Sequence, residues 1–563
     1  MIEEKTNFLE LLKEKKYSLI VSIIENKISE KDKTPGLLNL CGVARMLSEK
    51  SNEVIRLAIK DFKDACFKET VTEKLFDPLK NLINASVILF DNEFRQNENE
   101  LEKNFFDDLY FFYNKNKSFF EKNSDLMHNF SKVVARTSDP EIVAKHHKKV
   151  FELDSNTDAF ISSIFWRNYN YGWGQEEYFN NLKKINDLVP LYNKDEFEQI
   201  INVKNEKLNI AFISSDIRGK HSIVYFLKSV INFYDKKKYN IFIYNNYNSY
   251  PQENKTIKEF EKKVFKILDI KTLKDIEVVN RIRKDKIDII IDLNGLSSDH
   301  RLALFKNRVA PVQISWCGYV NTTGLNEMDY LIADKNLIKP LEEKYYTEKI
   351  IYLNDIWNCH CGYDGARKFN LVPSAKKKFI TFGSFNNFRK INDDVIEVWS
   401  MILKRVKNSK LMLKTSFPIS TERFKKRFDE YGVLNSVTIL PFKKKFDNHL
   451  EIYRDIDIAL DTFPYNGVTT SFEAIWMGVP VLTMKGYNLN SRCGESINKN
   501  ANLSSLIAED KEDYVKKAVS LAQNEEELFT IRKNLFENVI ETPLFDGKKF
   551  CDSFFSSLEK IYN

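Results

Sequence analysis

Beyond about residue 205, short β-rich runs alternate with amphipathic helical segments. Strands that alternate with helices predict parallel sheets, because each connection must cross back over the face of the sheet. The runs form two successive series. They predict an α/β fold with two doubly wound, Rossmann-like domains that face one another and bind ligands at the carboxyl ends of their strands. The first series comprises 208–214, 239–244, 287–293 and 312–316, and the second comprises 379–384, 410–415, 436–440, 456–461 and 479–484.

The chain before residue 205 has a different pattern, in which apolar residues recur at helical spacing. Glycine is rare there, and only Gly36 and Gly42 precede Gly172. Segment 37–44 resembles the small-residue signature of a tetratricopeptide helix, but no clear period of about 34 residues recurs. We therefore expect an all-helical region, built either from degenerate repeats of this kind or as a plain helical bundle.

These patterns divide the chain into four expected parts. Residues 1–204 form the helical region, 205–370 the first Rossmann-like domain and 371–545 the second. Residues 546–563 form a terminal helix, because their apolar residues recur on one helical face. That face consists of Phe550, Phe554, Phe555, Leu558 and Ile561.

Charge and cysteine content exclude several classes of protein. The 86 Lys and Arg residues nearly balance 80 Asp and Glu residues, so the chain lacks the overall basic character of a nucleic-acid-binding protein. The first ten residues, MIEEKTNFLE, lack the basic-then-apolar order of a signal peptide, and no apolar run approaches the ~20 residues of a membrane span. Seven cysteines are few and odd in number. We expect a cytoplasmic protein without a membrane span or a nucleic-acid partner.

One short motif, Cys359-His360-Cys361, contains three residues of types that bind metals. Zinc sites use cysteines with two to four residues between them and need a second pair of ligands. Neither condition is met here, so we expect no metal at this motif.

The most informative stretch is 457–484. An apolar run ends at Asp461, a turn-rich loop follows, and Thr469 and Thr470 begin a helix that ends before Gly478. The unpaired N–H groups and the dipole at a helix N-terminus favour a phosphate. Thr470 and Glu473 also have the spacing of a capping box, in which each side chain accepts a bond from a backbone N–H of the other residue. The residues alone leave both interpretations open.

This stretch resembles the C-terminal half of the protein O-linked N-acetylglucosamine transferases, the family that includes the SPINDLY proteins. Five further blocks match that family in the same order, so the resemblance covers about 205–545. The matching blocks within 457–484 are Asp461-Thr462, Asn466-Gly467-Val468-Thr469-Thr470 and Gly478-Val479-Pro480. The others are 213–222, 292–301, 310–330, 385–406 and Ser491-Arg492.

The resemblance implies a GT-B architecture, a UDP-sugar donor and no cofactor or catalytic metal. Lys390 would contact the β-phosphate and stabilise the departing UDP, a role that suits a fixed cation. His221 stands at the active-site histidine position, either as general base or as a positioning group. The residues expected to bind the donor are Asn387, His449 (uracil), Asn466, Gly467, Thr469 and Thr470 (diphosphate), and Glu473 (ribose).

The function implied is inverting transfer of a sugar to Ser or Thr of proteins, with 1–204 presenting the acceptor. N-acetylglucosamine is the expected sugar; UDP-glucose stays open because Glu473 stands where animal members have Asp, and Asn387 where they have Gln. Flagellins or adhesins would be acceptors for a bacterial member. Three alternatives remain: an adhesin-type N-glucosyltransferase that modifies Asn, a non-catalytic helical scaffold, and a metabolite glycosyltransferase.

Overall fold

A computed structural model describes residues 7–96, 105–193, 197, 205–219, 221–247, 255–363, 373–415, 418–440 and 446–562. The chain forms two compact units. The first holds the N-terminal helices up to Ser163 and the start of a later helix, and the second begins at Ile164 and holds both sheets. Within the described ranges, no helix has both the length and the apolar character that a membrane span requires.

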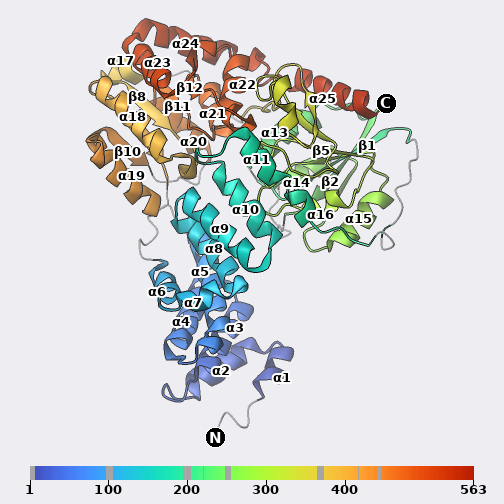
Figure 1. The fold of residues 1–563 in the computed structure, drawn as a ribbon, viewed down its shortest axis with the longest axis vertical. Helices are drawn as coiled ribbons and strands as arrows, with labels where there is room; N and C mark the ends of the chain where they lie inside the picture. Colours follow the sequence, from blue (N-terminus) through green and yellow to red (C-terminus); the bar gives the residue numbers. More distant parts are fainter. Residues whose placement is uncertain are drawn as a thin grey trace. The chain divides into compact units, whose positions relative to one another are not determined.

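Helices alone make up the described part of the chain before β1, as predicted (Figure 1). Helices α3 and α4 pack closely, because a Cβ on Gly42 would lie only 2.5 Å from the Phe62 ring. The side chains of Thr34 and Ser51 cap these two helices by accepting bonds from backbone N–H groups. The helices are α1 (Phe8–Lys13), α2 (Tyr17–Asn26), α3 (Pro35–Ser48), α4 (Asn52–Lys68), α5 (Phe76–Gln96), α6 (Asp107–Lys115), α7 (Lys117–Glu121), α8 (Ser124–Thr137), α9 (Pro140–Asp154), α10 (Thr157–Arg167), α11 (Gln175–Leu182) and α12 (Ile185–Leu188).

The first sheet has seven parallel strands in the order β3-β2-β1-β4-β5-β6-β7. The C-terminal helix α25 returns to this sheet, where it packs against α13 (Figure 1). The strands are β1 (Leu208–Ser214), β2 (Tyr239–Asn245), β3 (Lys266–Asp269), β4 (Ile289–Asp292), β5 (Val312–Ser315), β6 (Tyr330–Ala333) and β7 (Lys349–Tyr352). The helices are α13 (Ser222–Ile231), α14 (Lys255–Glu261), α15 (Asp275–Lys284), α16 (Leu302–Lys306) and α25 (Gly547–Tyr562), with the 3-10 helix η4 (Pro340–Tyr345).

The second sheet has six parallel strands in the order β10-β9-β8-β11-β12-β13. Its central strands β8 and β11 are buried. In open sheets of this kind, ligands bind at the loops that follow the carboxyl ends of the strands. The strands are β8 (Thr381–Ser384), β9 (Lys410–Lys414), β10 (Val437–Leu440), β11 (Ile458–Leu460), β12 (Val481–Met484) and β13 (Ile507–Ala508). The helices are α17 (Pro373–Lys377), η5 (Phe388–Lys390), α18 (Asp393–Arg405), α19 (Pro418–Glu430), α20 (Phe446–Glu451), α21 (Thr469–Trp476), α22 (Cys493–Asn500), α23 (Lys511–Gln523) and α24 (Glu525–Asn538).

Every run that the sequence predicted as a strand contains one, and the predicted pair of parallel, doubly wound sheets is confirmed. Strands β3, β6, β7 and β13 were not predicted. Each has four residues or fewer, and β3, β7 and β13 lie at or next to sheet edges. Such short segments show too few alternations for a periodicity signal.

Helix α18 illustrates how local signals and packing agree. The Asn392 side chain accepts a bond from Val395 N at 3.0 Å and so caps the helix, and two aspartates occupy the first turn, where the helix dipole favours them. Trp399 of this helix is fully buried in the core of the second sheet.

We predict that Trp399→Ala lowers the free energy of unfolding by about 3–5 kcal/mol, because it removes a fully buried aromatic side chain and leaves a cavity. Met401 lies on the same helix with 42% of its surface exposed, so Met401→Ala should change stability by less than about 0.5 kcal/mol. Urea unfolding followed by circular dichroism measures both. Equal losses for the two variants would contradict this account of the core.

Candidate functional site

A buried carboxylate organises the loop between β11 and α21. Asp461 accepts bonds from Thr462 N at 2.8 Å, Gly467 N at 2.6 Å and Thr483 Oγ1 at 2.8 Å. Burial raises the pKa of Asp461 to about 6, although these hydrogen bonds and the charge of Lys390 oppose the shift. The loop is therefore folded around one anionic oxygen pair at the carboxyl end of a central strand.

Only glycine fits at position 467, because the loop leaves no space for a Cβ atom there. A Cβ there would lie 2.6 Å from Thr470 Oγ1 and 2.7 Å from Asn386 Oδ1, both closer than atoms can approach. The neighbouring Asn466 is fully buried, donates through Nδ2 to Thr462 O at 2.9 Å and accepts at Oδ1 from Gly494 N at 3.1 Å. Both side-chain ends of Asn466 are thus held.

Helix α21 begins at Thr469 without a side-chain cap, so the capping-box interpretation is wrong. Thr470 Oγ1 donates instead to Asn386 Oδ1 at 2.8 Å, and the Glu473 carboxylate faces His449 and Tyr453. Ser471 N and Phe472 N donate to Val468 O at 3.0 Å, whereas the N–H groups of Thr469 and Thr470 have no acceptor within the helix. Such unpaired N–H groups at a helix start favour an anion. Of the two interpretations that the sequence left open, the geometry favours an anion site.

Lys390 lies beside this loop. It ends the 3-10 helix η5, and its Nζ donates to Asn466 O at 2.6 Å while lying 4.1 Å from the centroid of the Tyr465 ring. Burial lowers the pKa of Lys390 to about 8, and the Asp461 carboxylate opposes that shift. The result is a fixed cation held against the backbone of the loop that precedes α21.

A chain of polar side chains extends from Glu473. Lysine carries only donors, so Lys414 Nζ donates to His449 Nδ1 at 2.7 Å, which leaves the ring proton on Nε2. That nitrogen lies 3.0 Å from Glu473 Oε2, and Tyr453 OH donates to the same oxygen at 2.8 Å. Burial and the Glu473 charge raise the pKa of Tyr453 well above its ordinary value, so the phenol stays a donor.

His221 lies on the other sheet, directly before α13. Its Nδ1 accepts weakly from Ile223 N at 3.4 Å, and its Nε2 lies 3.5 Å from Asp216 Oδ1. Burial lowers the pKa of His221, Asp216 opposes the shift, and the positive charge of Arg218 adds to it. A neutral imidazole with a carboxylate behind it is thereby available at the carboxyl end of β1.

The structure brings together Lys390, Asn466, Gly467 and Thr470, with Thr469 in the same first turn of α21. Glu473 and His449 form a second group one turn further along α21. Asn387 is exposed and caps η5 by accepting from Arg389 N at 3.1 Å. No bond between described residues joins His221 to either group.

Sequence reasoning did not identify Asn386, Lys414 or Tyr453 as site residues, and it did not identify the organising role of Asp461. Asn386 and Asp461 stand inside the matching blocks, and that position was a usable signal. Lys414 ends β9 and Tyr453 lies in a 3-10 helix, and both reach Glu473 or its partner only through the tertiary fold.

The Cys359-His360-Cys361 motif is packed among aromatic rings. The His360 ring lies 4.6 Å from that of Tyr225 and 4.2 Å from that of Tyr363, and its Nδ1 accepts from Gly362 N at 3.0 Å. Over the described ranges, no group of three or more His, Cys, Asp or Glu is placed to hold a metal ion.

Two parallel Rossmann-like sheets, with an anion-favouring helix start after β11, define the GT-B class of glycosyltransferase fold. The chain matches the family model of glycosyl transferase family 41 over residues 182–362 and 365–554. It therefore belongs to glycosyl transferase family 41, and the predicted family and fold class are confirmed.

Similar proteins agree with this placement. The chain is 33% identical over 365 residues to a probable UDP-N-acetylglucosamine–peptide N-acetylglucosaminyltransferase SPINDLY of Petunia hybrida, covering 63% of this chain and 39% of that protein. The SPINDLY protein of Arabidopsis thaliana is 30% identical over 424 residues, covering 73% and 44%. The chain thus spans less than half the length of these relatives.

Among solved structures, a mutant O-GlcNAc transferase from Thermobaculum terrenum shares the fold. Its TM-score is 0.75 at 21% sequence identity, and the match covers 99% of this chain and 98% of that chain.

We predict that the pKa of Lys390 is about 8, below its ordinary value of 10.5, because burial disfavours the ammonium form. Asp461→Asn should lower this midpoint further, since it removes the nearby negative charge that stabilises the cation. NMR titration of lysine labelled with ¹³C at Cε measures the value, and Lys390→Arg assigns the signal by its loss. A wild-type midpoint at 10.5 or above would contradict the described burial.

Proposed function

We propose that this chain is an inverting protein O-glycosyltransferase that transfers N-acetylglucosamine from a UDP-sugar to Ser or Thr hydroxyl groups. The observation that carries the proposal is the contact of Lys390 Nζ with Asn466 O, 2.6 Å, beside the uncapped start of α21. A cation and a helix N-terminus on one loop suit the diphosphate of a nucleotide sugar. Membership of family 41 supports the same activity.

The proposed chemistry is positioning together with electrostatic stabilisation. The first-turn amides of α21, with Thr469, Thr470 and Gly467, bind the diphosphate, and Asn466 and Asn387 shape the loops on either side. Lys390 neutralises the charge that develops on UDP as the glycosidic bond breaks. Because a fixed cation stands at the leaving group, the reaction as proposed needs no metal.

The nucleoside is proposed to bind next to the second group of polar residues. Glu473 accepts ribose hydroxyls, and the His449 ring stacks on uracil. Lys414 supports this role because it keeps the His449 proton on Nε2, directed at Glu473. The ring orientation is therefore fixed before the donor binds, which limits the entropy lost on binding.

His221 is proposed to act on the acceptor hydroxyl. A neutral imidazole can accept a proton, and Asp216 at 3.5 Å stabilises the imidazolium that forms. Its free electron pair is on Nδ1, where Ile223 N makes only a weak 3.4 Å contact that an acceptor could displace. As a positioning group alone, His221 would orient the hydroxyl without accepting its proton.

The helical region 1–204 is proposed to present protein acceptors, flagellins or adhesins among them, in the cytoplasm. The names of the SPINDLY relatives describe peptide N-acetylglucosaminyl transfer, and this supports a protein acceptor over a metabolite. Transfer of glucose to Asn and a non-catalytic scaffold are the competing functions. The anion-favouring loop with its fixed cation weighs against the scaffold.

Incubation of the purified chain with a panel of UDP- and GDP-sugars and a cell lysate tests the proposal. We expect modified proteins only with UDP-N-acetylglucosamine, detected by intact mass, with fragmentation locating the sugar on Ser or Thr. Modification of Asn with UDP-glucose would establish the N-glucosyltransferase instead. No product and no thermal shift with UDP would favour the scaffold.

We predict that Lys390→Ala lowers kcat by about 100- to 1,000-fold, since it removes the only proposed cation at the leaving group. Lys390→Arg keeps the charge and should retain more activity than the alanine variant. Steady-state transfer kinetics at pH 7 measure both, and a melting temperature within a few degrees of wild type serves as the folding control. Equal kcat in Lys390→Ala and wild type would exclude the proposed role.

A further inference from the structure

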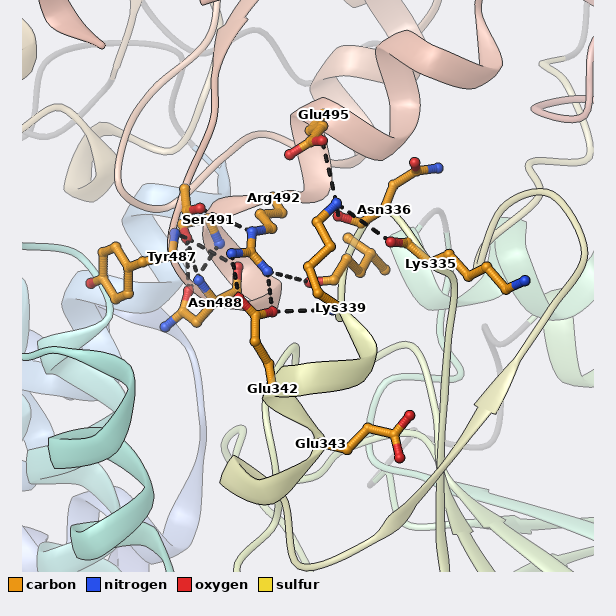
Figure 2. A network of polar contacts seen from close by, with 12 residues as sticks. Lys335, Asn336, Lys339, Glu342, Glu343, Tyr487, Asn488, Ser491, Arg492 and Glu495 are labelled. Carbon is orange, nitrogen blue, oxygen red and sulfur yellow. Dashed lines mark hydrogen bonds and ion pairs between the residues drawn. The ribbon is translucent and has the colours of Figure 1, made fainter. Parts of the chain in front are cut away.

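An ion pair joins the two sheets at the residue before α22 (Figure 2). Arg492 directly precedes α22 of the second sheet, and Glu342 lies in η4, which follows β6 of the first. Arg492 Nη2 donates to Glu342 Oε1 at 2.7 Å, and its Nη1 donates to Oε2 of the same carboxylate. This bidentate geometry fixes the orientation of the guanidinium relative to the carboxylate as well as the distance between them.

The pair is partly removed from water, and both partners make further hydrogen bonds. Arg492 is 9% exposed, and its Nε also donates to Gly486 O at 2.9 Å. Glu342 accepts a further bond from Lys339 N at 3.1 Å, and Figure 2 shows these contacts converging between the two ribbons. Ion pairs in such surroundings are screened little by solvent, so loss of one partner leaves an uncompensated charge.

Helix α22 adds two contacts to the same segment of the first sheet. Ser496 Oγ donates to Asp334 Oδ2 at 2.6 Å, and Lys339 Nζ lies 3.5 Å from Glu495 Oε1 (Figure 2 shows the latter). The first two turns of α22 are thus bound to the stretch that follows β6. We call Arg492 and Glu342, with these contacts, the interdomain clasp.

The start of α22 also contacts the phosphate-favouring loop. Gly494 N donates to Asn466 Oδ1 at 3.1 Å, and Asn466 N donates to Asn490 O at 3.3 Å. A Cβ on Gly494 would lie 2.0 Å from Thr483 Oγ1 and 2.7 Å from Asp461 Oδ2, so the helix is packed directly on the side chains that organise the loop. Asn466 in turn accepts the Lys390 ammonium through its carbonyl.

We propose that Arg492 and Glu342 are positioning residues for transfer, because their bond holds the Asn466 loop and Lys390 in register with the sheet that carries His221. Neither residue is among those proposed to bind the donor. The bond acts through the start of α22 and Asn466, and the inference rests on the function proposed above. It makes the relative placement of the proposed donor and acceptor groups depend on this ion pair together with the α22 contacts beside it.

Breaking this bond should affect the transfer step more than donor binding. The residues proposed to bind the diphosphate, ribose and uracil all belong to the second sheet, its loops and its helices, so donor binding should depend little on the first sheet. Alignment with His221 requires both domains, and misplacement of reacting groups by about 1 Å costs on the order of 100-fold in rate. The expected signature is a fall in kcat with little change in KM for the UDP-sugar.

The test uses Glu342→Gln in the full chain. We expect kcat to fall about 10- to 100-fold, while KM for the UDP-sugar and the thermal shift with UDP change less than about twofold. Glu509→Gln is the matched control. Glu509 pairs with Lys485, both residues directly follow strands of the second sheet, and the Glu509 side chain is 65% exposed. The kcat of this variant should therefore equal that of wild type. Arg492→Lys keeps the charge without the bidentate bond and should show an intermediate loss.

Hydrogen exchange followed by mass spectrometry gives a readout that needs no activity. In Glu342→Gln, peptides containing Gly467 and Gly494 should exchange faster than in wild type, while peptides from β1 keep their protection. If wild type transfers no sugar yet this exchange pattern appears, the proposed function fails and the clasp stands. Folded Glu342→Gln and Arg492→Lys variants with unchanged kcat and unchanged exchange would overturn the inference.

Discussion

The site depends on one buried carboxylate. Asp461 stands where a central strand ends, and it closes the following loop by accepting two backbone N–H groups and one hydroxyl. Burying a carboxylate is costly unless it is bonded, and the loop supplies those bonds only in one conformation. The start of α21, the carbonyl that receives Lys390 and the close packing at Gly467 all follow from that conformation.

Electrostatics link this loop to the cation. Burial raises the pKa of Asp461 to about 6 and lowers that of Lys390 to about 8, while each charge opposes the shift of the other. At neutral pH both groups are therefore largely ionised, although both are buried. A cation held by a backbone carbonyl and an aromatic face keeps donor capacity for a ligand, because an ammonium has three N–H groups.

Much of the fold could be predicted because its signals are local. The buried strands of both sheets and the capped start of α18 are set by periodicity and by residues close in sequence. The short strands β3, β6, β7 and β13 near the sheet edges were not predicted, because two to four residues give only a weak periodicity signal. The capping box at Thr470 failed for a different reason. The helix begins at Thr469, so Thr470 lies inside the first turn, where its hydroxyl donates to Asn386, and Glu473 accepts from Tyr453.

The sequence by itself determined the two parallel sheets, the preceding helices and the loop from Asp461 to Thr470, because each is encoded by neighbours along the chain. Only the tertiary structure decided which groups meet: Lys390 with Asn466, Lys414 with His449, and Arg492 with Glu342. These partners are separated by 76, 35 and 150 positions. No local pattern specifies such pairs, since packing of the sheets and their helices sets the distance between them.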